Sequence, residues 1–198
     1  MTSSRRMGSV DSEKAESMLD AAETILRDEG YAALTSRRVA DMLGIKQRLV
    51  YYYFQTMEDL MLATFKRLSG RELRRIRAAA KSERPLHEVW RICMDTSDAR
   101  LVSEFMALAN RSDGIRAEVI KFVETSRKIQ IDVWKKAIAE NKIELKLTSP
   151  EVIAIIGASV ALTLNRESSL GVKCGHAALS KEINNFFSSV ENAIDLPA

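Results

Sequence analysis

Residues 35–54, TSRRVADMLGIKQRLVYYYF, predict two short helices joined at a glycine. Thr35 is a hydroxyl residue whose side-chain oxygen can cap the first helix by accepting a backbone N–H. Apolar residues then recur at helical spacing and give this helix one buried face: Val39, Ala40 and Leu43. Gly44 is expected to end the helix, because a residue without a Cβ adopts the left-handed conformation at little cost. Two short helices around such a turn are typical of a helix-turn-helix that reads DNA.

The second helix, predicted to start at Lys46, carries the side chains expected to contact DNA. Its first turn, where a recognition helix meets base edges, holds Lys46, Gln47 and Arg48. One to two turns later come three tyrosines within reach of phosphates: Tyr51, Tyr52 and Tyr53. The start of the first helix completes the predicted DNA-binding set with Thr35, Ser36 and Arg37.

The surroundings of this motif, residues 21–62, are more specific than the motif itself. They contain, in order, Glu-Gly-Tyr, Thr, Val-Ala, Gly-Ile, Tyr-x-Tyr-Phe and Glu-x-Leu. In this order the first third of the chain resembles the tetracycline-repressor (TetR) family of regulators. The resemblance implies an all-α protein with a helix-turn-helix head and a helical body that binds a ligand and dimerises. It also implies a repressor that binds a palindromic DNA operator as a homodimer and is released by a small-molecule effector.

Three positions depart from the family pattern. The family usually has Ser where this chain has Lys46, Gly where it has Arg48, and a phosphate-contacting Lys where it has Met57. Met57 is therefore not assigned to DNA, and Lys46 exchanges a good N-cap for a positive charge.

Composition and charge agree with this interpretation. The 198 residues are 46% apolar with three prolines and eight glycines, enough for a helical core. Residues 1–81 hold 15 Lys and Arg against 11 Asp and Glu, whereas the whole chain has a net charge of only +3. The excess positive charge therefore lies in the part that carries the motif, as expected for a DNA-binding head on a nearly neutral body.

Cysteine spacing and hydropathy indicate a cytoplasmic protein without a metal site or membrane contact. As a DNA-binding regulator it is also expected to be associated with the nucleoid and to need no cofactor. Cys93 and Cys174 are far apart, so neither a disulfide framework nor a metal knuckle is indicated. The N-terminus MTSSRRMGSV lacks the apolar stretch of a secretory signal. The most apolar run, residues 152–164, is too short to span a bilayer.

The chain divides into four predicted segments: a disordered tail at 1–12, the DNA-binding domain at 13–56, a connecting helix at 57–81 and the ligand-binding and dimerisation domain at 82–198. Ser82–Pro85 breaks the helical pattern between the last two. In the last segment we expect helices near 86–96, 98–111, 115–141, 150–167 and 176–194.

The two last helices are expected to form the dimer interface, as in the family. The helix that begins at Ser149 and Pro150 is apolar on nearly all sides, so other helices must cover more than one side of it. The final helix carries an aromatic-rich apolar stripe that is unfavourable in water. The predicted interface comprises Ile153, Gly157, Val160, Ala161, Leu164, Leu179, Ile183, Phe186, Phe187 and Val190. The alternative is an ordinary intramolecular core.

An effector pocket is expected among the helices between 86 and 167. Large apolar and soft side chains predominate among the candidates, which are Trp90, Cys93, Met94, Phe105, Met106, Phe122, Arg127, Trp134 and Asn165. Each apolar candidate could equally be core. Arg127 interrupts an apolar face and needs a partner, which is either Glu104 of the preceding helix or an acidic ligand.

Two other classes of protein compete with a regulator. A di-iron helical enzyme needs a Glu three residues before each ligating His, whereas Arg84 precedes His87 and Lys173 precedes His176. No phosphate-binding loop or Ser-His-Asp arrangement is found in the sequence, so we expect no enzyme. A helical adaptor that binds only protein would leave the cations and tyrosines of residues 46–53 unexplained.

Overall fold

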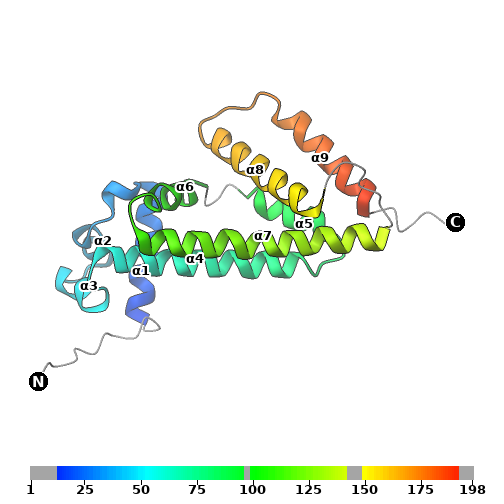
Figure 1. Ribbon diagram of the computed structural model, residues 1–198. Coiled ribbons are helices and arrows are strands. Elements are labelled where there is room, and N and C mark those ends of the chain that lie inside the picture. The colour runs from blue at the N-terminus through cyan, green and yellow to red at the C-terminus, as the bar shows by residue number, and fades with distance from the viewer. Residues whose placement is uncertain (1–12, 96–98, 142–148, 192–198) are drawn as a thin grey trace, which may run out of the picture. The chain divides into compact units, whose positions relative to one another are not determined.

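The computed structural model describes residues 13–95, 99–141 and 149–191, and in these ranges the chain is entirely helical and turn (Figure 1). Nine α-helices and one 3₁₀ helix are present in the described part. They group into two compact units: residues 1–69 with 100–119, and residues 70–99 with 120–198. The predicted all-α fold is confirmed.

The first unit contains the N-terminal helices. Their bounds are α1 Glu13–Asp28, η1 Tyr31–Ala33, α2 Ser36–Leu43 and α3 Gln47–Tyr53, followed by the first part of α4, Met57–Ala79. Helix α6, Ala99–Leu108, and the start of α7, Asp113–Asn141, complete this unit. Its core includes Ile25 of α1, Val39 of α2 and Val50 of α3, all fully buried. Because each helix contributes one apolar face, three short helices can share a single core.

A network of partly buried ion pairs connects α1 to α4. Arg67 of α4 donates hydrogen bonds to Glu23 at 2.9 Å and to Glu16 at 2.9 Å, and lies 2.7 Å from Asp20. Three carboxylates one turn apart on α1 therefore hold one guanidinium. This network holds the first part of α4 against α1, and it accounts for Arg67 among the basic residues of α4.

The second unit is built from the remainder of α4 and α7 and from three further helices: α5 Pro85–Cys93, α8 Pro150–Ser169 and α9 His176–Glu191. Its core combines all five elements and consists of Ile76, Ala79, Leu86, Val89, Ile92, Val133, Trp134, Ala137, Ala154, Phe187 and Val190. The predicted start of α8 is confirmed, since Ser149 caps it by accepting a hydrogen bond from the Val152 backbone N–H and Pro150 takes the first position.

A polar cluster joins the end of α9 to the start of α5. The Glu191 carboxylate accepts a hydrogen bond from the Leu86 backbone N–H at 2.6 Å and also contacts the imidazole of His87. Arg84 lies 3.5 Å from the same carboxylate. A carboxylate at the N-terminus of α5 satisfies an otherwise unpaired helix N–H and favours the helix dipole.

The compact units do not follow the boundary expected at residue 82. Both α4 and α7 continue through the division, and α6 packs in the first unit rather than with the body. The reason is side-chain packing: Phe105 of α6 meets Phe65 of α4 with ring centroids 4.8 Å apart, and Lys66 pairs with Glu118 at 3.5 Å. The tail expected at 1–12 and the end of the helix expected at 176–194 lie outside the described residues.

Candidate functional site

The turn between α2 and α3 has the geometry expected from its sequence. The Thr35 side chain accepts a hydrogen bond from the Arg38 backbone N–H at 3.1 Å. Gly44 adopts φ 64° and ψ 29°, the left-handed conformation that ends α2. A side chain at Gly44 would be strained by this backbone conformation rather than by crowding, because an added Cβ meets nothing within 4 Å. The angle between the two helices therefore depends on glycine at this position.

Ser36 links the two helices of the motif. Its hydroxyl donates to the phenol oxygen of Tyr51 at 3.0 Å and accepts a hydrogen bond from Nε2 of Gln47 at 2.7 Å. Ser36 itself is buried, whereas Gln47 and Tyr51 are exposed. Ser36 was predicted to contact DNA, but its place in the structure is that of a positioning residue that orients two exposed side chains of α3.

The remaining predicted DNA-binding residues form the outer surface of this motif. Lys46 occupies the N-cap of α3 without a side-chain cap, as its chemistry predicts. The exposed residues include Thr35, Arg37, Lys46, Arg48 and Tyr52. Tyr53 is half-buried and packs edge to face against Tyr52 with ring centroids 5.2 Å apart. Val50 and Phe54 lie inside, as predicted.

Two supporting interactions were not found from the sequence. Thr56 and Asp59 form a reciprocal cap at the start of α4: the Thr56 backbone N–H donates to Asp59 at 2.9 Å and the Asp59 N–H donates to Thr56 Oγ1 at 3.0 Å. The Thr-x-x-Asp spacing was the available signal. Arg38 pairs with Glu29 at 2.6 Å, and this hydrogen bond lowers the pKa of Glu29. Both interactions fix the ends of the motif.

Residues 18–64, which enclose this motif, match the family described as "Bacterial regulatory proteins, tetR family". This N-terminal head has the sequence pattern of the TetR family. The match begins in α1 and ends in the first part of α4, so it covers the three-helix head described above.

Two curated proteins that are similar to this chain are regulators. It is 26% identical over 124 residues to the HTH-type transcriptional regulator CymR of Pseudomonas putida, covering 59% of this chain and 61% of that protein. It is 31% identical over 58 residues to the HTH-type transcriptional regulator BetI of Rhizobium meliloti, covering 29% of each. The matched regions thus span less than two thirds of either relative.

Solved structures share the fold over nearly the whole chain. A transcriptional regulator from Saccharomonospora viridis, solved in complex with choline, aligns with a TM-score of 0.78 at 13% identity and covers 89% of this chain and 96% of its own. A TetR/AcrR-family regulator from Thermobifida fusca aligns with a TM-score of 0.68 at 17% identity. The alignment covers 93% of this chain and 98% of that regulator. At these identities the likeness concerns the fold alone.

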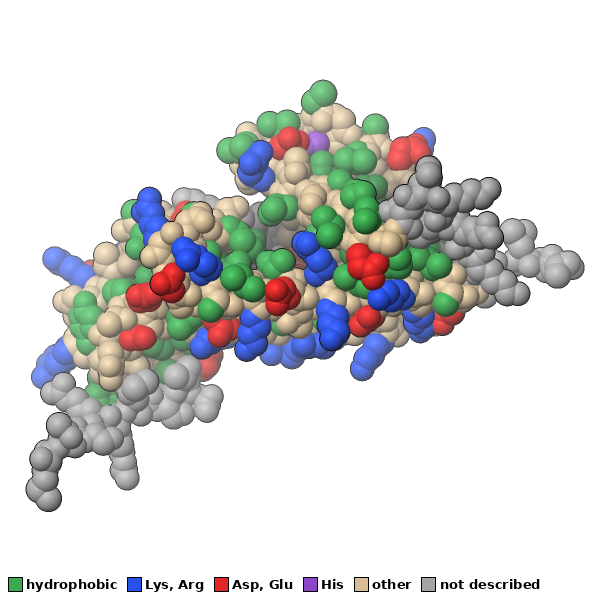
Figure 2. Space-filling view, in the orientation of Figure 1, with side chains coloured by type: hydrophobic (Ala, Val, Ile, Leu, Met, Phe, Trp, Pro, Cys, Tyr) green, Lys and Arg blue, Asp and Glu red, His purple; other side chains and the backbone are tan. Residues whose placement is uncertain are grey.

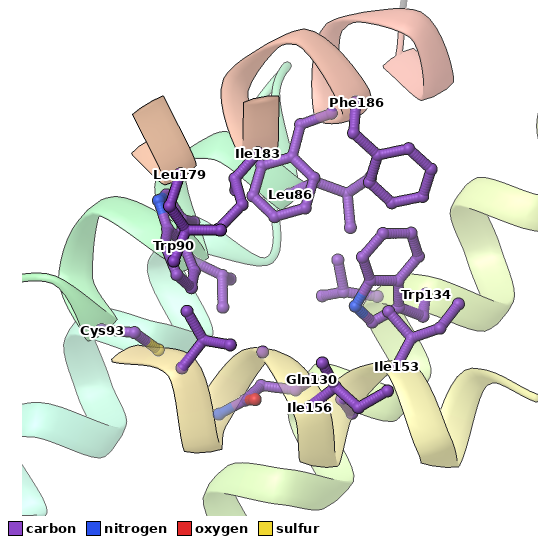
Figure 3. A pocket seen from close by; sticks show the side chains of 16 residues that line it. Leu86, Trp90, Cys93, Gln130, Trp134, Ile153, Ile156, Leu179, Ile183 and Phe186 are labelled. Atoms are coloured by element: carbon purple, nitrogen blue, oxygen red, sulfur yellow. The ribbon is translucent and has the colours of Figure 1, made fainter. Parts of the chain in front are cut away.

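The second unit contains a cavity of about 220 Å³ among α5, α7, α8 and α9 (Figure 3). Trp90 of α5 and Trp134 of α7 lie on opposite sides of it, with Phe186 of α9 along one edge and Ile156 of α8 along the other. Of the lining residues in the described ranges, only Gln130 has an amide or charged side chain. The cavity can therefore hold an apolar group, and Gln130 can form one hydrogen bond.

Three of the predicted ligand-binding residues line this cavity: Trp90, Cys93 and Trp134. Asn165 lies behind the wall, where its Nδ2 donates to the Cys93 carbonyl at 2.8 Å. The other candidates do not line the cavity, and Phe105 and Met106 belong to the first unit. The sequence missed Gln130 and the whole contribution of α9, because those residues repeat at the spacing of any apolar helix face.

Cys93 is buried in the cavity wall, and burial raises the pKa of its thiol to about 11. A neighbouring carboxylate, Glu72, acts in the same direction. Both effects disfavour the thiolate, which is the reactive form of cysteine. Cys93 therefore contributes a neutral, polarisable surface to the cavity rather than a nucleophile.

Arg127 does not line the cavity. Its Nε is buried and has no hydrogen-bond partner in the part of the chain that the structure describes. Arg127 belongs to the second unit and Glu104 to the first, so the choice between an internal ion pair and an acidic ligand remains a prediction.

The predicted interface residues separate into two groups. Ala161, Leu164, Phe187 and Val190 are buried in the chain's own core and present no free surface. Ile153, Gly157, Val160, Leu179, Ile183 and Phe186 line the cavity, together with Phe187. Large hydrophobic side chains that do remain exposed on α8 are Val152, Ile155, Ile156 and Leu162, and Figure 2 shows hydrophobic surface over α8 and α9. The interface expected from the sequence is thus partly core, because α8 is apolar on several sides.

Proposed function

We propose that this chain is a DNA-binding transcriptional regulator, a repressor without enzymatic activity, that binds a palindromic operator as a homodimer. The observation that carries the proposal is the Ser36–Gln47–Tyr51 arrangement, which orients exposed polar side chains of α3 beside Lys46 and Arg48. A recognition helix needs such side chains at its N-terminal end to meet base edges, and phosphate-contacting groups beyond them. The match of residues 18–64 to the TetR family and the similarity to the regulator CymR support the same function.

Homodimerisation is supported by the surface of α8. Ile155, Ile156 and Leu162 are each about half exposed, although apolar patches of this kind are unfavourable in water. Gly157 supports a close approach by another helix, because an added Cβ there meets nothing within 4 Å of this chain. A second copy would cover the patch with the same patch, as in a two-fold symmetric interface. It would also place two heads at a spacing that matches a palindrome.

Release by a small, mostly apolar effector is supported by the cavity of the second unit. The protein has one conformation that binds DNA and one that does not. A ligand releases DNA only if its affinity is higher for the conformation that does not bind DNA. Helix α4 is continuous through both compact units and would carry this coupling. In this proposal the protein acts in the cytoplasm on the nucleoid, and it needs no cofactor or metal.

A gel shift on the DNA upstream of the chain's own coding sequence tests the proposal. The protein is expected to bind this DNA more tightly than a scrambled duplex, and the affinity should fall steeply with salt because phosphate contacts release counterions. An enzyme or a protein-binding adaptor would show no specific shift. Binding that is equal on both duplexes would contradict sequence-specific regulation.

A further inference from the structure

The residues of α8 and α9 that line the cavities between these helices change from apolar to polar along the helix axes. On α8 the residues that face the cavities step by three and four from Ile156 through Val160 to Thr163 and Glu167. On α9 the corresponding stripe runs from Phe186 and Ile183 through Leu179 to His176. Because the two helices run in opposite directions in this region, their polar ends meet each other, as do their apolar ends (Figure 1).

A second, more open cavity of about 350 Å³ lies at the polar end. Glu167 and His176 face each other there, with Oε2 and Nε2 2.8 Å apart. The hydroxyls of Ser159 and Thr163 also line it. This cavity therefore differs from the first in that it contains an acidic side chain and several hydrogen-bonding groups.

The two cavities adjoin, because Val160 of α8 and Leu179 of α9 line both of them. From Ile153 at the apolar end to Glu167 at the polar end, α8 advances fourteen residues, roughly 21 Å at 1.5 Å per residue. A ligand that occupied both cavities would be elongated, with its apolar part among the tryptophans and its polar end near Glu167.

We infer that the effector of the proposed regulator is a cationic amphiphile, with an apolar chain between Trp90 and Trp134 and an ammonium head beside Glu167. Among the described residues that line the two cavities, Glu167 is the only Asp or Glu, and none is Lys or Arg. A carboxylate head would meet Glu167 with like charge, whereas an ammonium would form a charge-assisted hydrogen bond. The inference rests on the proposed effector control, but its test requires no DNA.

Tryptophan fluorescence measures this binding directly, since the chain has two tryptophans and both line the first cavity. We would titrate the full chain with dodecylammonium, dodecanol and dodecanoate below their aggregation limits. The expected order of affinity is dodecylammonium, then dodecanol, then dodecanoate. Shortening the ammonium probe should weaken binding about fourfold per methylene removed until only the head remains.

Matched variants locate the head group and the chain. Glu167→Gln keeps a hydrogen-bonding side chain and should weaken dodecylammonium about tenfold while dodecanol changes less than twofold. The control Glu182→Gln removes the same charge from an exposed position of α9 that lines neither cavity, and should change neither affinity. Val160→Trp should block the passage between the cavities, so that dodecylammonium weakens more than a hexyl analogue.

Several results would overturn the inference. Tighter binding of dodecanoate, especially if it is lost in Arg127→Met, would indicate an acidic effector instead. Equal effects of Glu167→Gln and Glu182→Gln would remove the head group from this cavity. Emission that responds to protein concentration but to none of the probes would make the groove an interface between two copies. Specific operator binding in the gel shift would leave the proposed function intact in each case.

Discussion

The α2–α3 motif and the α8–α9 segment differ in where their large apolar side chains lie. In the motif, Val50 and Phe54 are buried, and the exposed side chains include cations, the amide of Gln47 and two tyrosines. On α8, the small Ala154 and Ala161 face inward, while Ile155 and Leu162 remain on the surface. The motif therefore presents a polar surface, as the proposed contact with DNA requires. The α8–α9 segment leaves apolar side chains exposed in a single chain, as the proposed contact with a second copy requires.

The largest expected effect tests which aromatic residue of α9 belongs to the core. Phe187 is 8% exposed and meets Trp134 with ring centroids 5.8 Å apart, whereas Phe186 is 42% exposed. Phe187→Ala should therefore lower the free energy of unfolding by about 3–5 kcal/mol, because it leaves a cavity. Phe186→Ala should cost about 1 kcal/mol, mainly its stacking on Trp134. Urea denaturation followed by circular dichroism measures both, and equal losses would show that the two positions are not distinguished.

The next effect tests whether the exposed residues of α8 contact a second copy. Ile155→Glu should leave helicity unchanged but weaken self-association by about 2 kcal/mol or more, roughly thirtyfold, because it buries an unpaired charge in the interface. Ile120→Glu is the control, since Ile120 lies on α7 rather than on α8 and is 50% exposed, against 43% for Ile155. Light scattering over a dilution series gives the result. A dimer that survives Ile155→Glu would place the interface elsewhere.

The third effect tests the division of labour within the motif. Arg48→Ala should lose about 1–3 kcal/mol of operator binding and relax the preference at one base pair. Ser36→Ala should reduce binding less and to all sequences, because it only releases Gln47 and Tyr51 from their orientation. Gel shifts on an operator library separate these outcomes. A sequence-blind loss in both variants would remove Arg48 from base reading.

The smallest effect compares the two cysteines. Because burial raises the pKa of Cys93 from 9.0 to about 11, Cys93 holds about a hundredfold less thiolate at pH 8 than a thiol with the ordinary value. Cys174 is exposed. Ellman's reagent should therefore titrate one fast equivalent and one slow one, and Cys174→Ser should remove the fast phase. The slow phase should accelerate as pH rises toward 11. If both cysteines react in the fast phase instead, the burial of the Cys93 thiol in the cavity wall is contradicted.

Helix bounds and caps were largely predictable because they depend on neighbours in the sequence. The cap at Thr35, the left-handed Gly44 and the start of α8 at Ser149 each follow from one residue's conformational preference. Within the described ranges, no helix is both long and apolar enough to span a bilayer. The role of Ser36 was not predictable, since a hydroxyl can cap, contact DNA or hold a neighbouring helix, and the residues fifteen positions away decide among these.

The sequence by itself determined the all-α fold, the helix-turn-helix and its family, because these rest on local spacing and on residues with few allowed conformations. Only the tertiary structure decided which faces of α8 and α9 are core, cavity wall or surface. Both helices are apolar on several sides, so periodicity alone does not distinguish Phe186 from Phe187 or Ile155 from Ala154. That assignment depends on which helix packs against each face, and the packing partners of α8 and α9 come from α5 and α7, far away in the sequence.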